Sequence, residues 1–434
     1  MSVMIAPTEN GIKLEPTTQR TGGHCRTLPT VRLDRGNFSS MTASLSWRAR
    51  MMLRAVVDLP CGSLTVHTPE GLALFIGGRA EGPHGEIVLR NWNLAGRAFA
   101  NATVGVAESY IDGDWNSPDI TALLQLFAVN EAAGQQVARG AAPLFNVLQR
   151  LRHRLNRNTR AGARRNISVH YDLGNAFYRQ WLGPSMTYSS ALYTNGANDL
   201  ESAQAAKYRA LARDAGLGPS DHVLEIGCGW GGFAEFAARE IGCRVTALTI
   251  SSEQHAFARE RIARAGLTDK VDIRLQDYRD EQGIYDRVVS IEMFEAVGER
   301  YWPLFFGKLR AWLKPGGLAG MQVITIRDSA YARYRAQPDF IQRYIFPGGM
   351  LPTPSIMRKL SAEHGLSVAG ERIFGHDYAR TLAAWRSRFH DSWETIAPLG
   401  FDERFRKLWS FYLHYCEAGF RANYIDVRHL TLRG

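Results

Sequence analysis

Cysteine is scarce in this sequence of 434 residues. The five cysteines are Cys25, Cys61, Cys228, Cys243 and Cys416, and no two of them form a CxxC pair. An odd number at such wide spacing predicts neither a disulfide framework nor a zinc site. We therefore expect no metal and a reduced, cytoplasmic environment.

Long apolar runs are also absent. No stretch of about 18 apolar residues occurs, so no transmembrane helix is predicted. The first residues lack the charged start and apolar core of a signal peptide. Any contact with a membrane is therefore expected to be peripheral, at the inner membrane face.

Acidic residues are missing from Ala132 to Tyr171, where eight arginines occur. This segment supplies most of the formal net charge of +10, and such an excess favours an anionic membrane surface or nucleic acid as partner. Leucines recur among the arginines at helical spacing. The pattern fits a solvated linker helix, an amphipathic segment lying on anionic lipid, or an RNA contact.

The length and a composition of 45% apolar and 22% charged residues indicate a globular chain of two or three domains. Residues 1–42 show no periodicity and predict a flexible tail. Residues 43–135 mix strand-like and helical runs and predict a small α+β domain, and residues 136–166 form the Arg-rich linker. Residues 167–434 alternate helices and strands, which predicts an α/β, Rossmann-like domain with a doubly wound, mostly parallel sheet. Its expected strands are His222–Ile226, Arg244–Ile250, Val271–Gln276, Arg287–Ile291 and Leu318–Ile326, with helices at Leu200–Ala215, Gly232–Glu240, Glu253–Ala265 and Tyr301–Leu313.

A glycine-rich turn follows the first of these strands. The strand ends in Glu225, and the turn carries Gly227, Gly229 and Gly231. Glycines let the backbone approach a ligand closely. A dinucleotide site needs an acidic residue at the end of the second strand, and that strand ends in Thr249 and Ser251 instead. The turn therefore fits an S-adenosylmethionine (SAM) methyltransferase better than a dehydrogenase.

Two further strands end in groups that suit a ligand. Asp277 and Tyr278 follow the third strand, where an acid can accept a hydrogen bond from an adenine amine and an aromatic ring can stack on the purine. Glu292 and Glu295 follow the fourth strand, at the edge of a parallel sheet where ligands bind. Two neighbouring acids favour one carboxyl with a raised pKa that can take a proton.

Together with stretches outside the sheet, these motifs resemble the cyclopropane fatty acid synthases, including the mycolic acid cyclopropane synthases. The resemblance runs from about Ala107 to the C-terminus. The motifs are HYDLGN (170–175), LEIGCGWGG (224–232), LTISSEQ (248–254), LQDYRD (275–280), MFEAVG (293–298), YIFPGG (344–349) and CEAGFRA (416–422).

The resemblance implies SAM as methyl donor and a bound bicarbonate as base. The implied SAM contacts are Tyr188, Ser189, Glu225, Gly227, Gly229, Gly231, Thr249, Ser251, Gln254, Asp277 and Tyr278. The implied bicarbonate ligands are Ser190, Glu295, Gln322, Ile324 and Tyr378. Cys416 is a candidate site residue, although a cysteine on a helix is more often a small buried hydrophobe than a nucleophile.

The sequence departs from the family pattern in the bicarbonate set. Ser190 replaces a cysteine and Gln322 replaces a histidine, so the positive charge that would favour an anion is missing. Glu292 stands where the family has a small residue, and its carboxylate could repel bicarbonate and act as the base itself. Bicarbonate is therefore a doubtful cofactor here.

The resemblance implies transfer of the SAM methyl carbon to the cis double bond of an unsaturated acyl chain in a membrane phospholipid, to give a cyclopropane. If the altered base site favours a hydride shift, the product is instead a methylene- or methyl-branched chain. A methyltransferase acting on RNA or a small molecule would also carry this SAM motif, and so would a catalytically silent binding protein. We expect a homodimer and no nucleic acid partner. Aromatic rings stabilise cations, and the candidates to line the lipid pocket are Phe294, Tyr301, Tyr344, Phe346, Tyr378 and Phe420.

Overall fold

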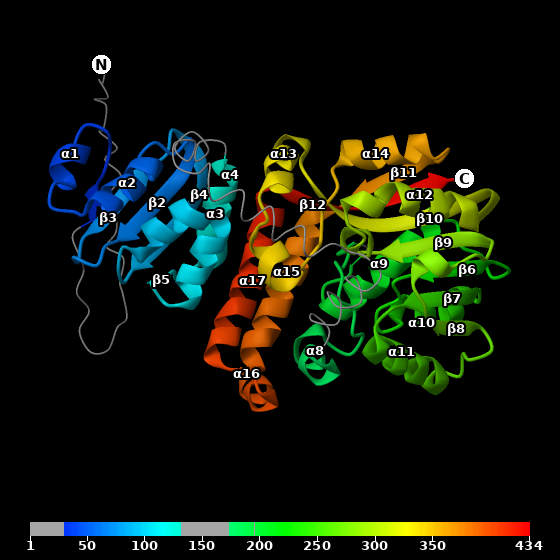
Figure 1. Ribbon diagram of the computed structural model, residues 1–434. Coiled ribbons are helices and arrows are strands. Elements are labelled where there is room, and N and C mark those ends of the chain that lie inside the picture. Colours follow the sequence, from blue (N-terminus) through cyan, green and yellow to red (C-terminus); the bar gives the residue numbers. More distant parts are fainter. Residues whose placement is uncertain (1–29, 132–172, 195) are drawn as a thin grey trace, which may run out of the picture.

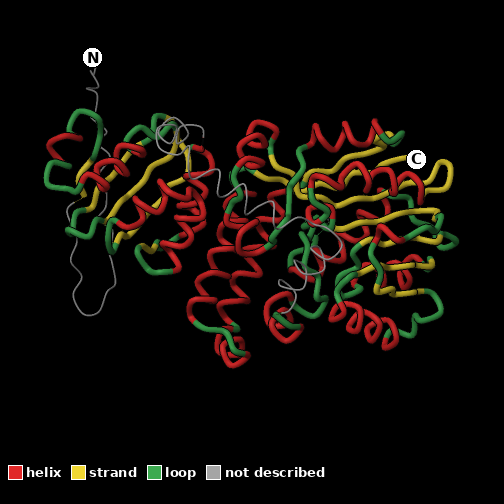
Figure 2. Tube along the Cα trace, in the orientation of Figure 1, coloured by secondary structure: helices red, strands yellow, loops and turns green. Residues whose placement is uncertain are grey.

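A computed structural model describes residues 30–131, 173–194 and 196–434. In Figure 1 a small unit lies on the left, a larger α/β unit lies on the right, and helices α15 (Gly375–Asp391) and α17 (Glu403–Arg421) stand between them. Figure 2 shows the strands gathered into two separate sheets at the two ends of the molecule. Within the described ranges, no helix is long and apolar enough to cross a bilayer.

The small unit is built on a five-stranded sheet with the order β1-β3-β2-β4-β5. Its strands are β1 (Thr30–Arg32), β2 (Cys61–His67), β3 (Ala73–Gly77), β4 (Ala80–Leu89) and β5 (Trp115–Asn116), and its helices are α1 (Phe38–Met41), α2 (Trp47–Val56), α3 (Asn93–Ile111) and α4 (Ile120–Val129).

Residues 30–42, which the sequence assigns to the flexible tail, carry strand β1 and helix α1 of this unit. Strand β1 pairs in parallel with β3, and Leu33 is 1% exposed. The short run Val31 and Leu33 gains its order from pairing with a distant strand, which local periodicity does not reveal. Residues 1–29 of the expected tail, and the Arg-rich linker 136–166, lie outside the described residues.

The larger unit has a seven-stranded sheet with the order β11-β12-β10-β9-β6-β7-β8. Strands β6 to β10 pair in parallel, and β12 runs antiparallel to both β10 and β11. The predicted doubly wound, mostly parallel sheet is confirmed. The strands are β6 (His222–Ile226), β7 (Arg244–Thr249), β8 (Val271–Leu275), β9 (Tyr285–Ile291), β10 (Leu313–Ile326), β11 (Ser367–Ile373) and β12 (Ile425–Arg433).

Ten helices accompany this sheet in the described chain, and most expected boundaries hold within one or two residues. They are α8 (Asn175–Leu182), α9 (Leu200–Asp214), α10 (Gly232–Phe236), α11 (Ser252–Arg264), α12 (Trp302–Trp312), α13 (Asp328–Ala336), α14 (Pro354–Glu363), α15, α16 (Trp393–Ile396) and α17. The helix expected at 232–240 is α10 followed by a π-helical turn, Ala237–Ile241. Side-chain caps fix several starts: Asp199 accepts a hydrogen bond from Ser202 N at 3.0 Å and so begins α9.

Two apolar layers hold the helices on the sheet. Consecutive strand residues point to opposite faces, so Val289 packs into the layer with α10 and α11, whereas Val288 packs into the layer with α12 and α14. Because helices cover both faces of this sheet, its polar groups gather at the carboxyl ends of the strands. Strand order reverses between β6 and β9, which is where ligands bind in such sheets.

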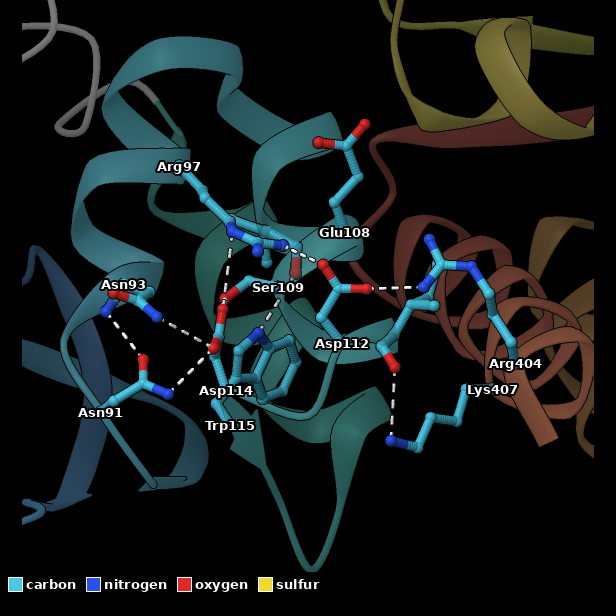
Figure 3. A network of polar contacts seen from close by, with 12 residues as sticks. Asn91, Asn93, Arg97, Glu108, Ser109, Asp112, Asp114, Trp115, Arg404 and Lys407 are labelled. Carbon is cyan, nitrogen blue, oxygen red and sulfur yellow. Dashed lines mark hydrogen bonds and ion pairs between the residues drawn. The ribbon is translucent and has the colours of Figure 1, made fainter.

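Polar contacts join the small unit to α17. In Figure 3, Asp112 lies between Arg97 of its own unit and Arg404 of α17, with N–O distances of 2.5 and 2.6 Å. Deeper in the junction, Thr121 of α4 contacts His414 Nδ1 at 2.7 Å, and both side chains are buried. The small unit is therefore docked on α17, which also borders the cavity described next.

Candidate active site

A cavity of about 680 Å³ opens at the carboxyl ends of β6, β7 and β9 and continues to the small unit. Ile226, Thr249 and Ile291 line it at the strand ends, and Val106 and Phe127 line it at the far end. Polar groups gather at the sheet end, and apolar groups predominate toward the small unit. The cavity thus combines a wall suited to a polar ligand with an apolar extension.

The glycine-rich turn forms one wall of the cavity. Gly227, Gly229 and Gly231 have φ values of 79°, 52° and 80°. A Cβ at Gly227 would lie 2.6 Å from Met293 Cγ, whereas a Cβ at Gly229 would meet no atom within 4 Å. The turn is therefore closely packed on one side and borders open space on the other, as a site for a ligand against the backbone requires.

Two of the predicted SAM contacts support this wall and do not line it. Gly231 closes the turn against Ala258, where an added Cβ would lie 3.0 Å from the alanine Cβ. Ser251 caps α11 by accepting from Gln254 N at 3.3 Å. The residues that do line the cavity are Tyr188, Ser189, Glu225, Gly227, Gly229, Thr249, Gln254, Asp277 and Tyr278.

Asp277 and Tyr278 lie together at the end of β8. The Asp277 carboxylate is 3% exposed at its side chain and pairs with Arg279, whose Nη2 lies 2.6 Å from Oδ2. Tyr278 meets Phe305 edge-on, and burial raises the pKa of its hydroxyl to about 12. The oxygens of Asp277 have further lone pairs, so the ion pair leaves it able to accept from a ligand amine.

Glu225 is 2% exposed, and its Oε2 has no hydrogen-bond partner in the described part of the chain. Burial raises its pKa to about 8, against the attraction of Lys207. An unpaired buried polar atom beside a glycine turn that borders open space fits a polar ligand at this wall. The residues present therefore fit SAM.

Glu292 is surrounded by hydrogen-bond donors. Oε1 accepts from Ser190 N at 2.8 Å and from Gln322 Nε2 at 2.6 Å, and Oε2 accepts from the Tyr378 hydroxyl at 2.6 Å. His429 Nε2 contacts Gln322 Oε1 at 3.0 Å, which turns the amide nitrogen toward Glu292. The residue at position 190 contributes its backbone, since the Ser190 hydroxyl donates to Ala191 O.

The three donors on Glu292 belong to the set expected to hold bicarbonate. With one carboxylate already on all three, these residues do not fit a separate bicarbonate ion at the same place. Burial raises the pKa of Glu292, and the donors oppose that rise. Ser190 and Gln322 are buried behind this carboxylate, whereas Glu292 and Tyr378 line the cavity.

The backbone at Glu292 is unusual. Its φ is 48°, in the left-handed region that favours glycine. Holding a residue with a side chain there costs about 1–2 kcal/mol. A strained backbone that delivers a carboxylate onto three donors indicates a functional position.

Glu295 lies beside Glu292 but has a different environment. Oε1 accepts from Ile324 N at 2.5 Å, and Oε2 is buried without a partner in the described chain. Burial, together with the charge of Glu292, raises the pKa of Glu295 to about 8. Burial thus favours the protonated form of Glu295, while Glu292 has the donors that stabilise a negative charge.

The aromatic lining differs from the expected set. Phe346, Tyr378 and Phe420 line the cavity, and Tyr378 stacks on Phe420 with ring centroids 4.4 Å apart. The prediction for Phe294 is wrong, because this ring lies in the core between sheet and helix at 0% exposure. Tyr301 and Tyr344 are also absent from the lining. Tyr188 and Tyr412 contribute instead, with their hydroxyls 2.8 Å apart.

Cys416 lines the cavity from α17, and burial raises the pKa of its thiol far above the usual range. It is therefore a thiol, not a nucleophilic thiolate. Sequence reasoning missed two residues: Lys207, which donates to Ser189, and His429, which orients Gln322. For Lys207 the sequence indicated only that it lies in a predicted helix, and for His429 it indicated nothing. Residues 170–172 of the motif HYDLGN lie outside the described chain.

Comparison with known proteins places this site among related ones. A family model described as mycolic acid cyclopropane synthetase matches residues 158–430. The chain is 40% identical, over 78% of its length and 81% of the relative's, to a tuberculostearic acid methyltransferase of Mycobacterium tuberculosis. It is 34% identical to the cyclopropane-fatty-acyl-phospholipid synthase of Escherichia coli, over 79% of its length and 86% of the relative's.

A solved structure shows the same architecture. A mycolic acid cyclopropane synthase, crystallised with SAH and CTAB, superposes with a TM-score of 0.59 at 28% identity, over 62% of this chain and 98% of that one.

Proposed function

Because the chain belongs to the mycolic acid cyclopropane synthetase family and is a SAM-dependent methyltransferase acting on lipids, we propose that it methylates the cis double bond of an unsaturated acyl chain in a membrane phospholipid. The observation that carries this proposal is the Glu292 carboxylate, held by three donors in a cavity that has a SAM-type wall and an apolar extension.

SAM, when bound, supplies an electrophilic methyl group. The chain's part is to hold it between the glycine turn and the Asp277–Tyr278 corner, with Glu225 and Gln254 as polar contacts. The acyl chain would lie in the apolar extension, with Phe127 and Ala128 of the small unit at its far end. This arrangement brings an alkene and a methyl donor together and excludes water.

Methylation of an alkene leaves a cation on the neighbouring carbon of the lipid. Tyr378 and Phe420 offer stacked ring faces at the cavity, and ring faces stabilise a cation. A base must then take a proton. Glu292 is the carboxylate beside these rings, and its hydrogen bond from Tyr378 fixes its position.

We infer that Glu292 performs the step for which the family resemblance implies bicarbonate. Loss of the proton from the added methyl closes a cyclopropane ring, and the proton ends on Glu292. The neutral Glu295 is beside it and supplies no competing negative charge at pH 7. The site therefore needs no bound anion.

A second product is favoured by one observation. Three hydrogen bonds to its carboxylate make Glu292 a weaker base than burial alone would make it, and slower proton removal lets the cation last longer. A hydride can then shift to the cation from the carbon that carries the new methyl, and proton loss gives a methylene-branched chain or a methyl-branched chain that keeps one double bond. The first step is the same for both products, and the relatives include both a tuberculostearic acid methyltransferase and a cyclopropane-fatty-acyl-phospholipid synthase.

The remaining parts of the proposal concern partners. We expect the anionic surface of the inner membrane face to attract the Arg-rich linker, which lies outside the described residues. We also propose a homodimer, and no nucleic acid partner.

Mass spectrometry of membrane lipids tests the function. The host should be rich in cis-monounsaturated phospholipids and lack a synthase of its own. Expression of the chain should add one CH2 to each modified acyl chain, and the position of the added carbon and of any double bond distinguishes a ring from a branch. Unchanged lipids, with folded protein that binds SAM, would contradict the proposal.

A further inference from the structure

A fully buried lysine lies beneath the site. Lys207 of α9 is 0% exposed, and its Nζ donates to the Ser189 hydroxyl at 2.5 Å. The ammonium also lies 4.4 Å from the centroid of the Tyr208 ring. Burying an ammonium group costs several kcal/mol unless opposite charges and hydrogen bonds compensate. A methionine of similar length would fill the space without that cost, so a role for the charge itself is indicated.

One face of α9 forms hydrogen bonds with residues 187–189, the segment that carries the predicted SAM contacts Tyr188 and Ser189. Gln204 Nε2 donates to Ser189 O at 2.8 Å, and the Tyr208 hydroxyl lies 3.0 Å from Thr187 Oγ1. Gln204, Lys207 and Tyr208 are three and four residues apart and therefore share one face of the helix. Three side chains thus hold Thr187 and Ser189, Gln204 through a backbone carbonyl and the other two through side-chain hydroxyls.

This segment leads directly to Glu292. The next residue, Ser190, donates its backbone N–H to Glu292 Oε1 at 2.8 Å, and its carbonyl oxygen accepts from Gln322 Nε2 at 3.4 Å. The position of Ser189 therefore sets the position of one of the three donors on the carboxylate. Lys207 therefore affects the position of Glu292 through Ser189 and Ser190.

We propose that Lys207 is a positioning residue for the reaction: it fixes Ser189 and Ser190 against Glu292, and its ammonium charge keeps the Glu292 carboxylate ionised in a dry site. This inference rests on the proposed function, in which Glu292 takes the proton. The inference identifies the Lys207 ammonium as the group that stabilises the ionised, buried Glu292 carboxylate.

The charges around the pair support this assignment. Burial lowers the pKa of Lys207 to about 7, and the attraction of Glu292 and Glu225 opposes that fall. Burial raises the pKa of Glu292 as well as those of Glu225 and Glu295, the last two to about 8, and it lowers the pKa of His429. Burial raises the pKa of Tyr378 well above its usual range. Glu292, with three donors, is thus the acid best placed to hold the negative charge that Lys207 balances.

The test is the pH dependence of methyl transfer under single-turnover conditions, with the full chain and dioleoyl phosphatidylglycerol vesicles. A nearby cation lowers a carboxyl pKa by about 1–3 units, so Lys207→Met should move the acid limb of the profile to higher pH by at least about one unit. The loss of rate, about tenfold or more on the acid side, should shrink as the pH rises. Lys207→Arg keeps the charge and should keep the limb of the wild type.

Gln204→Met is the matched control, because it removes a contact to the same Ser189 without changing charge. It should lower the rate equally at every pH. If Lys207→Met behaves like this control, or leaves the profile unchanged, Lys207 has only a structural role and the inference is wrong. Thermal unfolding of each variant verifies that it is folded.

A second readout separates this inference from the proposed function. Infrared titration of the carboxylate band, taken as the difference between a protein with Glu292 and the same protein with Glu292→Gln, reports ionisation of Glu292 without lipid. A higher midpoint in the Lys207→Met background supports the inference even if the wild type methylates no lipid. An unchanged midpoint overturns it even if methylation occurs.

Discussion

Replacing Glu292 with glycine should turn the enzyme into one that depends on bicarbonate. The change removes the carboxylate from three donors, Ser190 N, Gln322 Nε2 and the Tyr378 hydroxyl. It also places glycine at a φ of 48°, which relieves about 1–2 kcal/mol of backbone strain. The vacated space has donors arranged for an anion of the same shape.

The size of the effect follows from the role of a general base. Such a group contributes about 10²–10⁴-fold to rate, so Glu292→Gly should lose about that factor in buffer free of bicarbonate. Added bicarbonate should restore part of the loss with saturation, because a small anion can occupy the three donors. The wild type should not respond, since its donors are already engaged.

Glu292→Gln is the matched control. The amide fills the same volume and cannot take the proton, so its rate should fall by a similar factor and bicarbonate should not restore it. Methyl transfer to phospholipid vesicles measures all three proteins, and thermal unfolding verifies their folding. A wild type that requires bicarbonate, or a Glu292→Gln variant at full rate, would refute the assignment of Glu292 as base.

Three further predictions concern the surroundings of the site. Glu295 has a pKa of about 8 in the folded protein and about 4.5 in the unfolded chain. The folded state therefore holds a proton that the unfolded chain releases, and the protein loses stability as the pH rises from about 4.5 to 8. Glu295→Gln should flatten the fall in melting temperature over that range, and an unchanged slope would contradict this prediction. Glu417 is 0% exposed at its side chain and pairs with Arg386 and Arg421. Glu417→Ala should lower the free energy of unfolding, measured by urea titration, by about 3 kcal/mol. Removing the side chain of the exposed Glu403 should lower it by under about 1 kcal/mol. Ala128 lines the far end of the cavity; Ala128→Phe should lower the rate more for long acyl chains than for short ones at equal SAH affinity, and a uniform effect would place the acyl chain elsewhere.

The doubly wound class of the sheet, its five parallel strands and the place of the site could be predicted from the sequence, whereas β11 and β12 were not expected. Alternating helical and strand periods, with an acidic residue before a glycine turn, indicate both a doubly wound sheet and the edge at which ligands bind. The carboxyl pair Glu292 and Glu295 could be identified because both follow one strand. These signals are local, and local signals survive in a single sequence.

The remaining features depend on contacts between distant segments. Glu292 accepts from three donors because β10, α15 and residue 190 meet at one point in the fold. The spacing of these residues along the sequence does not indicate that they meet. The burial of Lys207 depends on packing between α9 and the segment before it. The burial of Phe294 depends on packing against α12, because its ring contacts Phe305. The strand β1 in the expected tail likewise depends on pairing with β3.

Whether the protein alkylates lipid without a bound anion can be measured with purified protein, SAM with a labelled methyl group and dioleoyl phosphatidylglycerol vesicles, in buffer stripped of bicarbonate. We predict that labelled carbon enters the acyl chain at the position of the double bond, at a rate that added bicarbonate does not change. No transfer of label would contradict the lipid substrate, and transfer only when bicarbonate is present would contradict the role of Glu292 as it is proposed here.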